Sequence, residues 1–411
     1  MKHKDTLLII VCCALITSVE AQQQQFYEQG APWFQDITQA ALDIGSASTI
    51  AFLQSKGGWG GGRFQIDFSI EVLTADQTTP FRTFTPTGDF YTPDCDLVPL
   101  PVPTVGNVEG ETGYQCVHDG DCHLLVFYTP TRVLYEMWRA NIANATFDGG
   151  CLAVWQLNTA WNADGRGNDC TSADAAGLQI SPLLFTADEV ASGQINHAIR
   201  FILPNDRIEH STYVHPGTHA TTAASGGATA PPYGARLRLR SDFPITSLPN
   251  QGARVVAAAL QKYGMFLADG GTVALTARSD NYTTSKWSGL LGALDLNTIK
   301  VTDFQMVNGG TRYTWVGDCN HVLGTKVPEK RSSSEMQLRL SVDHSGRIIV
   351  KGSSNTIDRI LIMDLSGRTL LVIPGNAIGS TAVTLHSGAF LYQAISRNNN
   401  IKGILLIYNR R

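Results

Sequence analysis

Charge is scarce in this sequence, and neither sign is concentrated in one region. Charged residues make up 16% of the 411 residues, the formal net charge is −4 and the isoelectric point is near 6.2. Lysine and arginine are scattered, apart from the short segment 326–331. Because nucleic-acid-binding proteins carry a basic patch or stripe, we expect no nucleic-acid partner.

Long apolar runs are also missing. The segment Leu7–Ile16 is too short to span a bilayer, and no later stretch is long and apolar enough to do so. The segment follows basic residues at positions 2–4, and Val19 and Ala21 then place small side chains where a signal peptidase cuts. This arrangement predicts a signal peptide over residues 1–21. It also predicts a secreted or cell-surface protein without a transmembrane segment.

The cysteines match neither a zinc ribbon nor a Cys-x-x-Cys redox motif. Two of the eight fall within the predicted signal peptide, and an even number remains. In an oxidising compartment such a set predicts disulfides. The sequence does not choose among the pairings, and the local pairs Cys116–Cys122 and Cys151–Cys170 are preferred. The remaining cysteines are Cys95, Cys116, Cys122, Cys151, Cys170 and Cys319.

Several catalytic motifs are absent. The glycine-rich run Gly57–Gly62 lacks the Lys-Ser/Thr of a phosphate-binding loop, and His215–His219 has Pro and Gly where a zinc protease has a helical Glu. Ser172 lacks the Gly-x-Ser-x-Gly setting of a serine hydrolase. A metal site shared by His123, His197 and His219 stays open, as do individually hydrogen-bonded histidines. The sequence names no cofactor.

The pattern that is present is mainly β. Phe64–Val72 alternates apolar and polar residues, as a half-buried strand does. Cys122–Tyr128 and Arg132–Ala140, joined by a Thr-Pro-Thr turn, predict a hairpin. We expect residues 22–307 to form a mainly β domain, a β-sandwich or jelly-roll-like fold with a few helices. The helices are predicted over Ala40–Gln54, Ala187–Gly193 and Gln251–Tyr263, and further strands over Ala153–Asn158, Ile195–Ile202, Tyr213–His215, Ala235–Arg240, Met265–Ala268 and Thr272–Thr276.

The C-terminal part changes in composition. Residues 308–335 are rich in turn-forming and polar residues, which predicts a linker. Residues 336–411 contain six short alternating segments separated by turn signals, which predict a small β-sandwich.

Three segments of this tail, Ile360–Arg368, Leu385–Tyr392 and Lys402–Leu405, carry a resemblance. Their order is similar to that of the C-terminal sorting domain of the type IX secretion pathway of Bacteroidota. The usual opening Tyr-Pro-Asn-Pro is missing, and Phe390 stands where Tyr is common. The resemblance implies that the type IX secretion machinery is a partner. A carbohydrate-binding or immunoglobulin-like module is the alternative.

Seven segments of residues 31–307 carry a second resemblance, namely Asp121–His123, Leu134–Glu136, Thr171–Leu178, Ile195–Phe201, Tyr213–His219, Tyr233–Arg236 and Leu260–Asp269. They are similar to those of a family of secreted bacterial and fungal proteins that are mostly uncharacterised. The resemblance implies a shared fold and brings no established activity. Members often stand beside carbohydrate-binding modules, which implies a polysaccharide substrate by association.

The stretch Asp169–Phe201 lies among most of the candidate catalytic side chains. A glycoside hydrolase needs two carboxyl groups across the sugar ring. We expect these from Asp121, Glu136 and Asp174, with His123, His197 and His219 assisting, and Trp138 and Arg139 suit a sugar ring and a uronate. Capping of a helix is an equal alternative for Asp174, and Asp119 is a further acidic candidate.

A polysaccharide lyase is the first alternative, because it needs a histidine or tyrosine base and a cation to neutralise the uronate. His197, Arg200, His219, Tyr213 and Arg236 supply these types on neighbouring predicted strands. A non-catalytic carbohydrate-binding or cell-surface protein is the second alternative. In that case the same residues only hold the loops.

Overall fold

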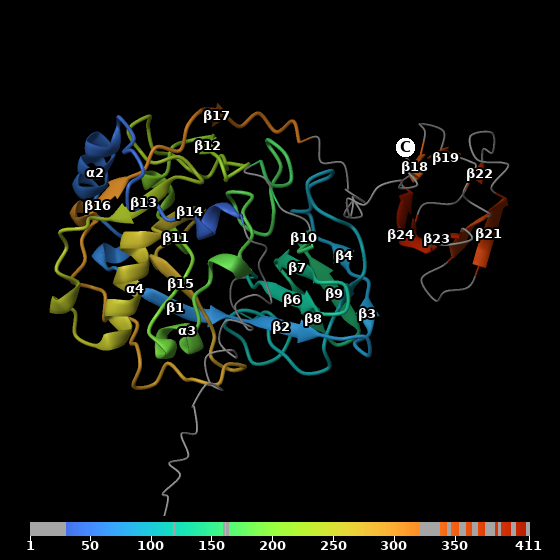
Figure 1. Cartoon of the computed structure of the whole chain (residues 1–411), viewed down its shortest axis with the longest axis horizontal. Coiled ribbons are helices and arrows are strands. Elements are labelled where there is room, and N and C mark those ends of the chain that lie inside the picture. The colour runs from blue at the N-terminus through green and yellow to red at the C-terminus, as the bar shows by residue number, and fades with distance from the viewer. Residues whose placement is uncertain are drawn as a thin grey trace, which may run out of the picture. The chain divides into compact units, whose positions relative to one another are not determined.

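A computed structural model describes residues 30–117, 120–158, 161 and 164–319, together with seven short strands between residues 338 and 407. The chain divides into two units, Met1–Val322 and Leu323–Arg411, which are treated separately (Figure 1). The predicted signal peptide, Asp119 and residues 320–335 of the predicted linker lie outside the described residues. No helix in the described part of the chain is long and apolar enough to cross a membrane.

The predicted mainly β class is confirmed, and a six-stranded sheet forms one half of the first unit. Its order is β1 (Ile66–Ile70), β15 (Leu275–Arg278), β11 (Ile199–Leu203), β14 (Met265–Gly270), β13 (Arg236–Leu239) and β16 (Phe304–Met306). β1 runs parallel to β15 and β11 parallel to β14, whereas the other neighbours are antiparallel. The sheet is therefore mixed, which the alternation of apolar residues does not predict, and differs in this detail from a jelly roll.

Three helices accompany this sheet in the described residues (Figure 1). α2 (Ser46–Ser55) packs on β16, α4 (Gln251–Lys262) packs on β13, and α3 (Ala187–Ser192) packs on α4. α3 begins with a capping box, in which the Thr186 and Glu189 side chains each accept the other's backbone N–H, and ends at left-handed Gly193. α2 begins six residues later than predicted, because Leu42 forms a β-bridge to Val307 instead.

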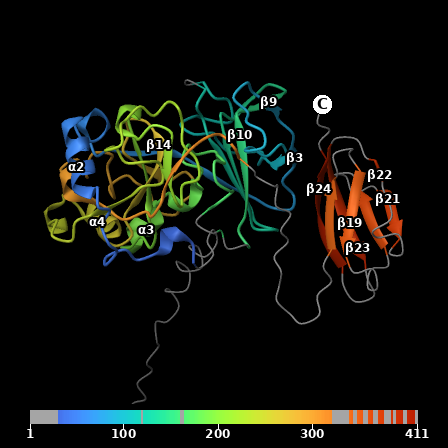
Figure 2. The ribbon, with the colours of Figure 1, turned by 90° about the horizontal axis from the view of Figure 1, so that it is seen from above.

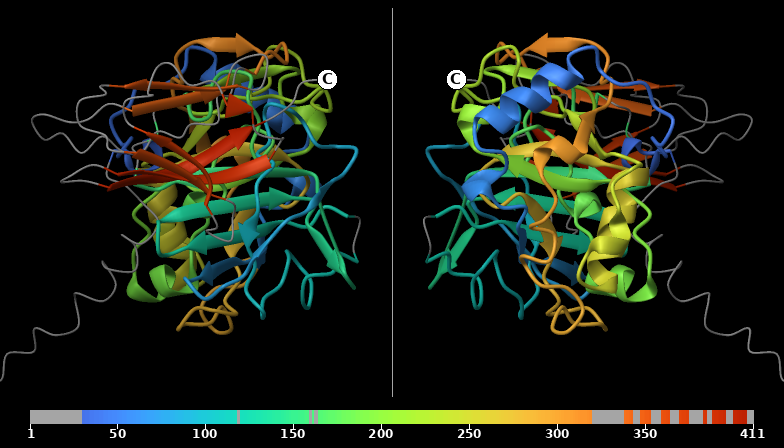
Figure 3. Two further views of the ribbon diagram at one scale, coloured as in Figure 1. Left: turned by 90° about the vertical axis from the view of Figure 1, so that its right-hand side faces the viewer. Right: turned by 90° about the vertical axis from the view of Figure 1, so that its left-hand side faces the viewer.

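A four-stranded sheet forms the other half of the first unit (Figure 3). Its order is β10 (Cys151–Gln156), β7 (Val133–Trp138), β6 (Leu124–Tyr128) and β2 (Val72–Ala75). β6 and β7 form the predicted hairpin. Only Glu71 separates β1 from β2, so the single segment 66–75 provides an edge strand to both sheets.

Small sheets of short strands complete the first unit. Two are pairs, β3 (Phe81–Arg82) with β5 (Leu100–Pro101) and β12 (Thr212–Val214) with β17 (Arg312–Thr314), and the third is a three-stranded sheet in the order β4 (Thr85–Pro86), β9 (Thr146–Gly149) and β8 (Asn141–Ala143). β17 lies beyond residue 307, where we expected the linker to begin. The 3-10 turns are Pro32–Phe34, Gly60–Gly62, Ser181–Leu183, Asn205–Arg207, Ile245–Ser247 and Val301–Asp303.

Alternation along β6 gives the four-stranded sheet two apolar faces. Leu124 and Val126 point into a cluster beneath the short strands, whereas Leu125 and Phe127 point to the opposite face. There Leu125 packs with Ile180 and other residues of the 173–184 stretch. The stretch that links the two sheets is thus itself part of the core.

Three disulfides are present, as the even number of cysteines predicts. Cys116–Cys122 is confirmed, but the predicted Cys151–Cys170 pair is wrong. Cys151 pairs with Cys95, because the loop that carries Cys95 runs along β10 and the Asp96 N–H donates to the Leu152 carbonyl. Cys170 pairs with Cys319, 149 residues away. This set fits a chain that folds in an oxidising compartment.

The second unit consists of two antiparallel sheets (Figure 2). One contains β18 (Leu338–Val342), β19 (Arg347–Gly352) and β22 (Val383–Thr384). The other contains β21 (Thr369–Pro374), β20 (Arg359–Met363), β23 (Gly388–Ile395) and β24 (Asn400–Ile407). All six predicted strands of the tail are present, and β22 is an additional short one.

Candidate functional site: a buried acidic centre

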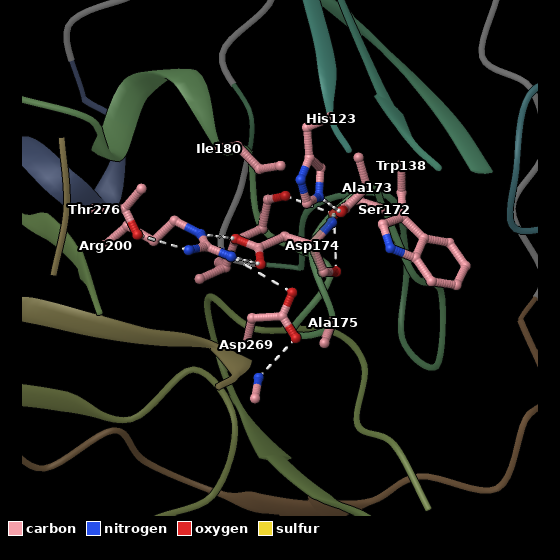
Figure 4. Close-up of polar contacts among 12 residues, drawn as sticks. His123, Trp138, Ser172, Ala173, Asp174, Ala175, Ile180, Arg200, Asp269 and Thr276 are labelled. Carbon is pink, nitrogen blue, oxygen red and sulfur yellow. Dashed lines mark hydrogen bonds and ion pairs between the residues drawn. The ribbon is translucent and has the colours of Figure 1, made fainter. Parts of the chain in front are cut away.

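The stretch Asp169–Phe201 connects the two sheets of the first unit. Near its start, a turn built on Thr171–Gly177 offers its backbone to the four-stranded sheet, and at its end Arg200 lies on β11 of the six-stranded sheet (Figure 4). Gly177 has φ +73°, and a Cβ there would lie 2.2 Å from the Thr218 hydroxyl and 2.7 Å from the Cys170 carbonyl. Only glycine fits this turn. The turn is therefore a fixed support for the side chains around it.

Arg200 on β11 holds the turn to the six-stranded sheet. Its Nε and Nη2 donate to the two oxygens of Asp174 at 3.0 and 2.8 Å, and its Nη1 donates to the Thr276 hydroxyl at 2.8 Å (Figure 4). The Arg200 side chain is 5% exposed and that of Asp174 is fully buried. Burial would lower the pKa of Arg200, but the charge of Asp174 and then that of Asp269 raise it. The guanidinium is thus a permanent cation inside the fold.

His123 and Glu109 form a second buried pair beside it. The Nδ1 of His123 lies 2.5 Å from Glu109 Oε2, and its Nε2 donates to the Ala173 carbonyl at 3.0 Å. Burial disfavours the charge on both groups. The attraction of Glu109 nevertheless raises the pKa of His123 to about 9, and that of His123, aided by Arg200, lowers the pKa of Glu109. At neutral pH the pair is an imidazolium and a carboxylate, and the Glu109 side chain is 20% exposed.

Asp269 completes the centre on β14. Its Oδ2 lies 3.4 Å from Arg200 Nη2, its Oδ1 accepts the Gly270 N–H, and its side chain is 28% exposed. Burial and repulsion from Asp174 raise the pKa of Asp269 to about 7, although Arg200 opposes the shift. Burial also raises the pKa of Asp67, which accepts from the Ser69 N–H and hydroxyl.

These residues stand on four neighbouring strands. Asp67 of β1 is the register partner of Thr276 on β15, Thr276 bonds Arg200 on β11, and Arg200 bonds Asp269 on β14. Because all four strands are adjacent in one sheet, the row is rigid. The row carries Asp269, an acid with a raised pKa. Glu109, a carboxylate with a lowered pKa, lies in the loop before β6, where its Oε1 is 3.4 Å from the hydroxyl of Ser69 on β1. Such a separation of pKa values is how enzymes divide acid and base roles between carboxyl groups.

The predicted carboxylates occupy three different environments. Glu136 is fully buried and accepts from the Ile180 N–H, the Ser181 N–H and hydroxyl, and the Trp155 indole. Burial raises its pKa. It holds the stretch onto β7 and does not reach solvent. Asp174 is likewise enclosed, and it pairs with Arg200 and does not cap a helix.

Asp121 is exposed on the loop before β6 and accepts a hydrogen bond from the Trp138 indole. Arg139 lies over the same indole, 5.3 Å from its centroid, and is ion-paired with Asp89 at 2.6 Å. Trp138 and Arg139 therefore form a surface group with Asp121. The indole N–H of Trp138 and the guanidinium of Arg139 already donate to protein carboxylates.

The three predicted histidines do not share one metal site. His123 bonds Glu109, His197 lies 3.2 Å from Glu189 with its Nδ1 bonded to the Ala198 carbonyl, and His219 bonds the Ala175 carbonyl. Burial would lower the pKa of His197, but Glu189 raises it. Among the described residues, the one group with ligand atoms close enough for a metal ion is Glu111, Cys116 and Cys122, and its two cysteines form a disulfide.

Arg236 and Tyr213, predicted to bind substrate, are both engaged. The Arg236 guanidinium donates to the carbonyls of Pro32, Gln35 and Tyr263 and so holds the N-terminal arm. Tyr213 is 1% exposed, its hydroxyl accepts the Asp169 N–H at 3.3 Å, and burial raises its pKa to about 12. Of the predicted residues, the structure thus gathers Asp174, Arg200 and His123 at the centre and leaves the others outside it.

Sequence reasoning missed Glu109, Asp269 and Asp67. Asp269 falls within Leu260–Asp269, one of the segments that carry the family resemblance, so this motif held the signal. Glu109 stands in a loop of Pro, Thr and Gly and gives no signal of its own. Comparisons with protein families, with curated proteins and with solved structures found no match to this chain.

Proposed function

We propose that the protein is a polysaccharide-cleaving enzyme, a glycoside hydrolase in which Asp269 is the general acid and Glu109 the opposing carboxylate. The observation that carries the proposal is the pKa separation between these two partly exposed groups beside Arg200. In a glycosidase one carboxyl group must be protonated and the other ionised at the working pH. Asp269 and Glu109 meet that requirement near pH 6.

The roles follow from the protonation states of the two groups. Protonated Asp269 gives its proton to the leaving glycosidic oxygen, and Glu109 stabilises the positive charge that develops on the anomeric carbon. Water then adds to the anomeric carbon and returns a proton to Asp269, so each cleavage produces one new reducing end. Arg200, His123 and Asp174 are positioning residues: Asp174 raises the pKa of Asp269, and His123 keeps Glu109 ionised.

A lyase has less support. Its base would be His219 or Tyr213, and it also needs a cation for the uronate. The guanidinium groups of Arg200 and Arg236 are occupied by Asp174 and by backbone carbonyls, respectively. Export by a signal peptide and sorting by the C-terminal unit complete the proposal, and the three disulfides support an extracellular location.

The test is reducing-end release from neutral and uronic polysaccharides by the mature chain. Asp269→Asn and Glu109→Gln should each lower kcat/KM by about 100-fold or more, while Asp242→Asn, a surface carboxylate paired with Arg240, should not change it. In the parent enzyme kcat/KM should fall as pH rises through about 7, because Asp269 then loses its proton. Full activity in Asp269→Asn would refute the assignment. Products that absorb in the ultraviolet would show that the enzyme cleaves by elimination, as a lyase does, and not by hydrolysis.

A further inference from the structure

Four half-buried aromatic rings lie close to the Thr171–Gly177 turn. His215 stacks on Tyr313 with centroids 4.7 Å apart, and His219 meets the edge of Trp315 at 4.9 Å. The rings come from segments about a hundred residues apart in sequence. His215 and His219 lie in the loop after β12, Tyr313 lies on β17, and Trp315 follows it. The Trp315 indole donates to the Asp169 carbonyl at 3.3 Å, so the cluster is fixed to the start of the turn.

His219 presents a hydrogen-bond acceptor in this cluster. Its Nδ1 lies 2.7 Å from the Ala175 carbonyl, which can only accept, so Nδ1 carries the proton. Burial lowers the pKa of His219, and the neutral ring therefore predominates at pH 7. In that tautomer Nε2 carries a lone pair and can accept a hydrogen bond from a ligand, because the side chain is partly exposed.

Asp169 supplies the second acceptor. It is 8% exposed, and its Oδ1 is buried with no hydrogen-bond partner among the described residues. Its backbone is held on both sides, because its N–H donates to the Tyr213 hydroxyl and its carbonyl accepts from Trp315. A buried carboxylate oxygen without a donor is destabilising. The Tyr213 hydroxyl interacts with the Asp169 carboxylate as well, and a ligand hydroxyl or ammonium group that reached Oδ1 would provide the donor that this oxygen lacks.

The charged groups that act on the two histidines are carboxylates. The charges that act on His219 are those of Asp94 and Asp169, and the charge that acts on His215 is that of Asp164. The nearby Arg312 is paired with Glu209 at 2.5 Å. Aromatic rings with carboxylate acceptors suit the C–H faces and hydroxyl groups of a sugar, and the negative field disfavours a uronate.

We infer that this cluster is a subsite for a neutral or amino sugar of the glycan that the acidic centre, Asp269 and Glu109 beside Arg200, cleaves. The subsite consists of the four rings of His215, His219, Tyr313 and Trp315 together with Asp169. The inference rests on the proposed function. The turn links the two places, because it carries Asp174, which binds Arg200 (Figure 4), and Ala175, whose carbonyl binds His219. The next residue, Ala176, donates its N–H to the Ala268 carbonyl on β14, directly before Asp269.

The Cys170–Cys319 disulfide holds the two halves of this subsite together. Cys170 follows Asp169 directly, and Cys319 lies four residues after Trp315. The cross-link thus ties the backbone segment that carries Asp169 to the segment that carries Trp315.

The experiment measures binding by calorimetry in the full mature chain carrying Asp269→Asn, which prevents turnover. The probes are cellohexaose, chitohexaose and hexagalacturonate. Trp315→Ala should weaken binding of the best neutral or amino-sugar probe by about tenfold, and Trp315→Phe should retain most of it because the ring remains. Trp161→Ala removes a half-buried tryptophan that packs on Trp155, away from this cluster; it is the matched control and should bind as the parent does.

Equal binding by Trp315→Ala and the parent, tighter binding of hexagalacturonate than of both other probes, or no binding of any probe would overturn the inference. The proposed function fails separately. If the enzyme with native Asp269 cleaves no glycan while ring-dependent binding persists, only the hydrolase assignment is lost. If it cleaves a glycan and Trp315→Ala changes neither binding nor KM, only the subsite is lost.

Discussion

Replacing Arg200 by methionine tests how the centre is held together. The change removes the guanidinium but keeps much of the side-chain shape, and it leaves fully buried Asp174 without its two donors at 2.8 and 3.0 Å. Breaking a buried ion pair by removing one partner costs about 3–5 kcal/mol. We therefore expect Arg200→Met to lower the free energy of unfolding by that amount.

Guanidinium denaturation followed by tryptophan fluorescence suits this measurement. All seven tryptophans precede residue 322, so the signal reports the first unit alone. Asp174→Asn should lower the free energy of unfolding by a similar amount. The loss in the double variant should be smaller than the sum of the two single losses by about 2–3 kcal/mol. Arg240→Met, which removes an exposed ion pair with Asp242, should leave the midpoint unchanged. Additive losses, or a midpoint in Arg200→Met equal to that of the parent, would refute the coupling.

Two further predictions concern stability. Glu136→Leu should lower the free energy of unfolding by at least about 3 kcal/mol, because it leaves the buried Ile180, Ser181 and Trp155 donors without an acceptor; a near-neutral change in the same denaturation assay would show that Glu136 is not an anchor. Replacing both Cys170 and Cys319 by serine should cost about 5 kcal/mol, against about 2 kcal/mol for the pair Cys116 and Cys122, because the closed loops differ in length, with sequence separations of 149 and 6. Non-reducing denaturation should rank the two variants in that order, and the reverse ranking would contradict it.

Local patterns predicted much of the fold. The hairpin of β6 and β7, the helix over Gln251–Lys262 and the six strands of the tail follow from periodicity and turn residues. The mixed order of the large sheet does not, because which strands become neighbours depends on contacts far apart in sequence. The Cys170–Cys319 disulfide was not predicted for the same reason.

The site was predicted in part. Asp174, Arg200 and His123 lie where the turn brings them together, and their residue types and positions in motifs pointed to them. Burial then separated supporting residues from reacting ones. A sequence shows that Glu136 alternates with apolar neighbours, but not that four donors enclose its carboxylate. Glu109 gave no pattern, since its role depends on a contact with His123 from another element.

The most direct test of the acid–base assignment needs no substrate. Carboxyl carbons of aspartate can be labelled with ¹³C in the mature chain and titrated by NMR, with the signal of Asp269 identified by its loss in Asp269→Asn. Our account predicts that this carboxyl group titrates with a pKa of about 7, raised by burial and by Asp174. A midpoint near the ordinary aspartate value of about 3.9 would contradict the account, because both carboxylates would then be ionised at neutral pH and no general acid would be present.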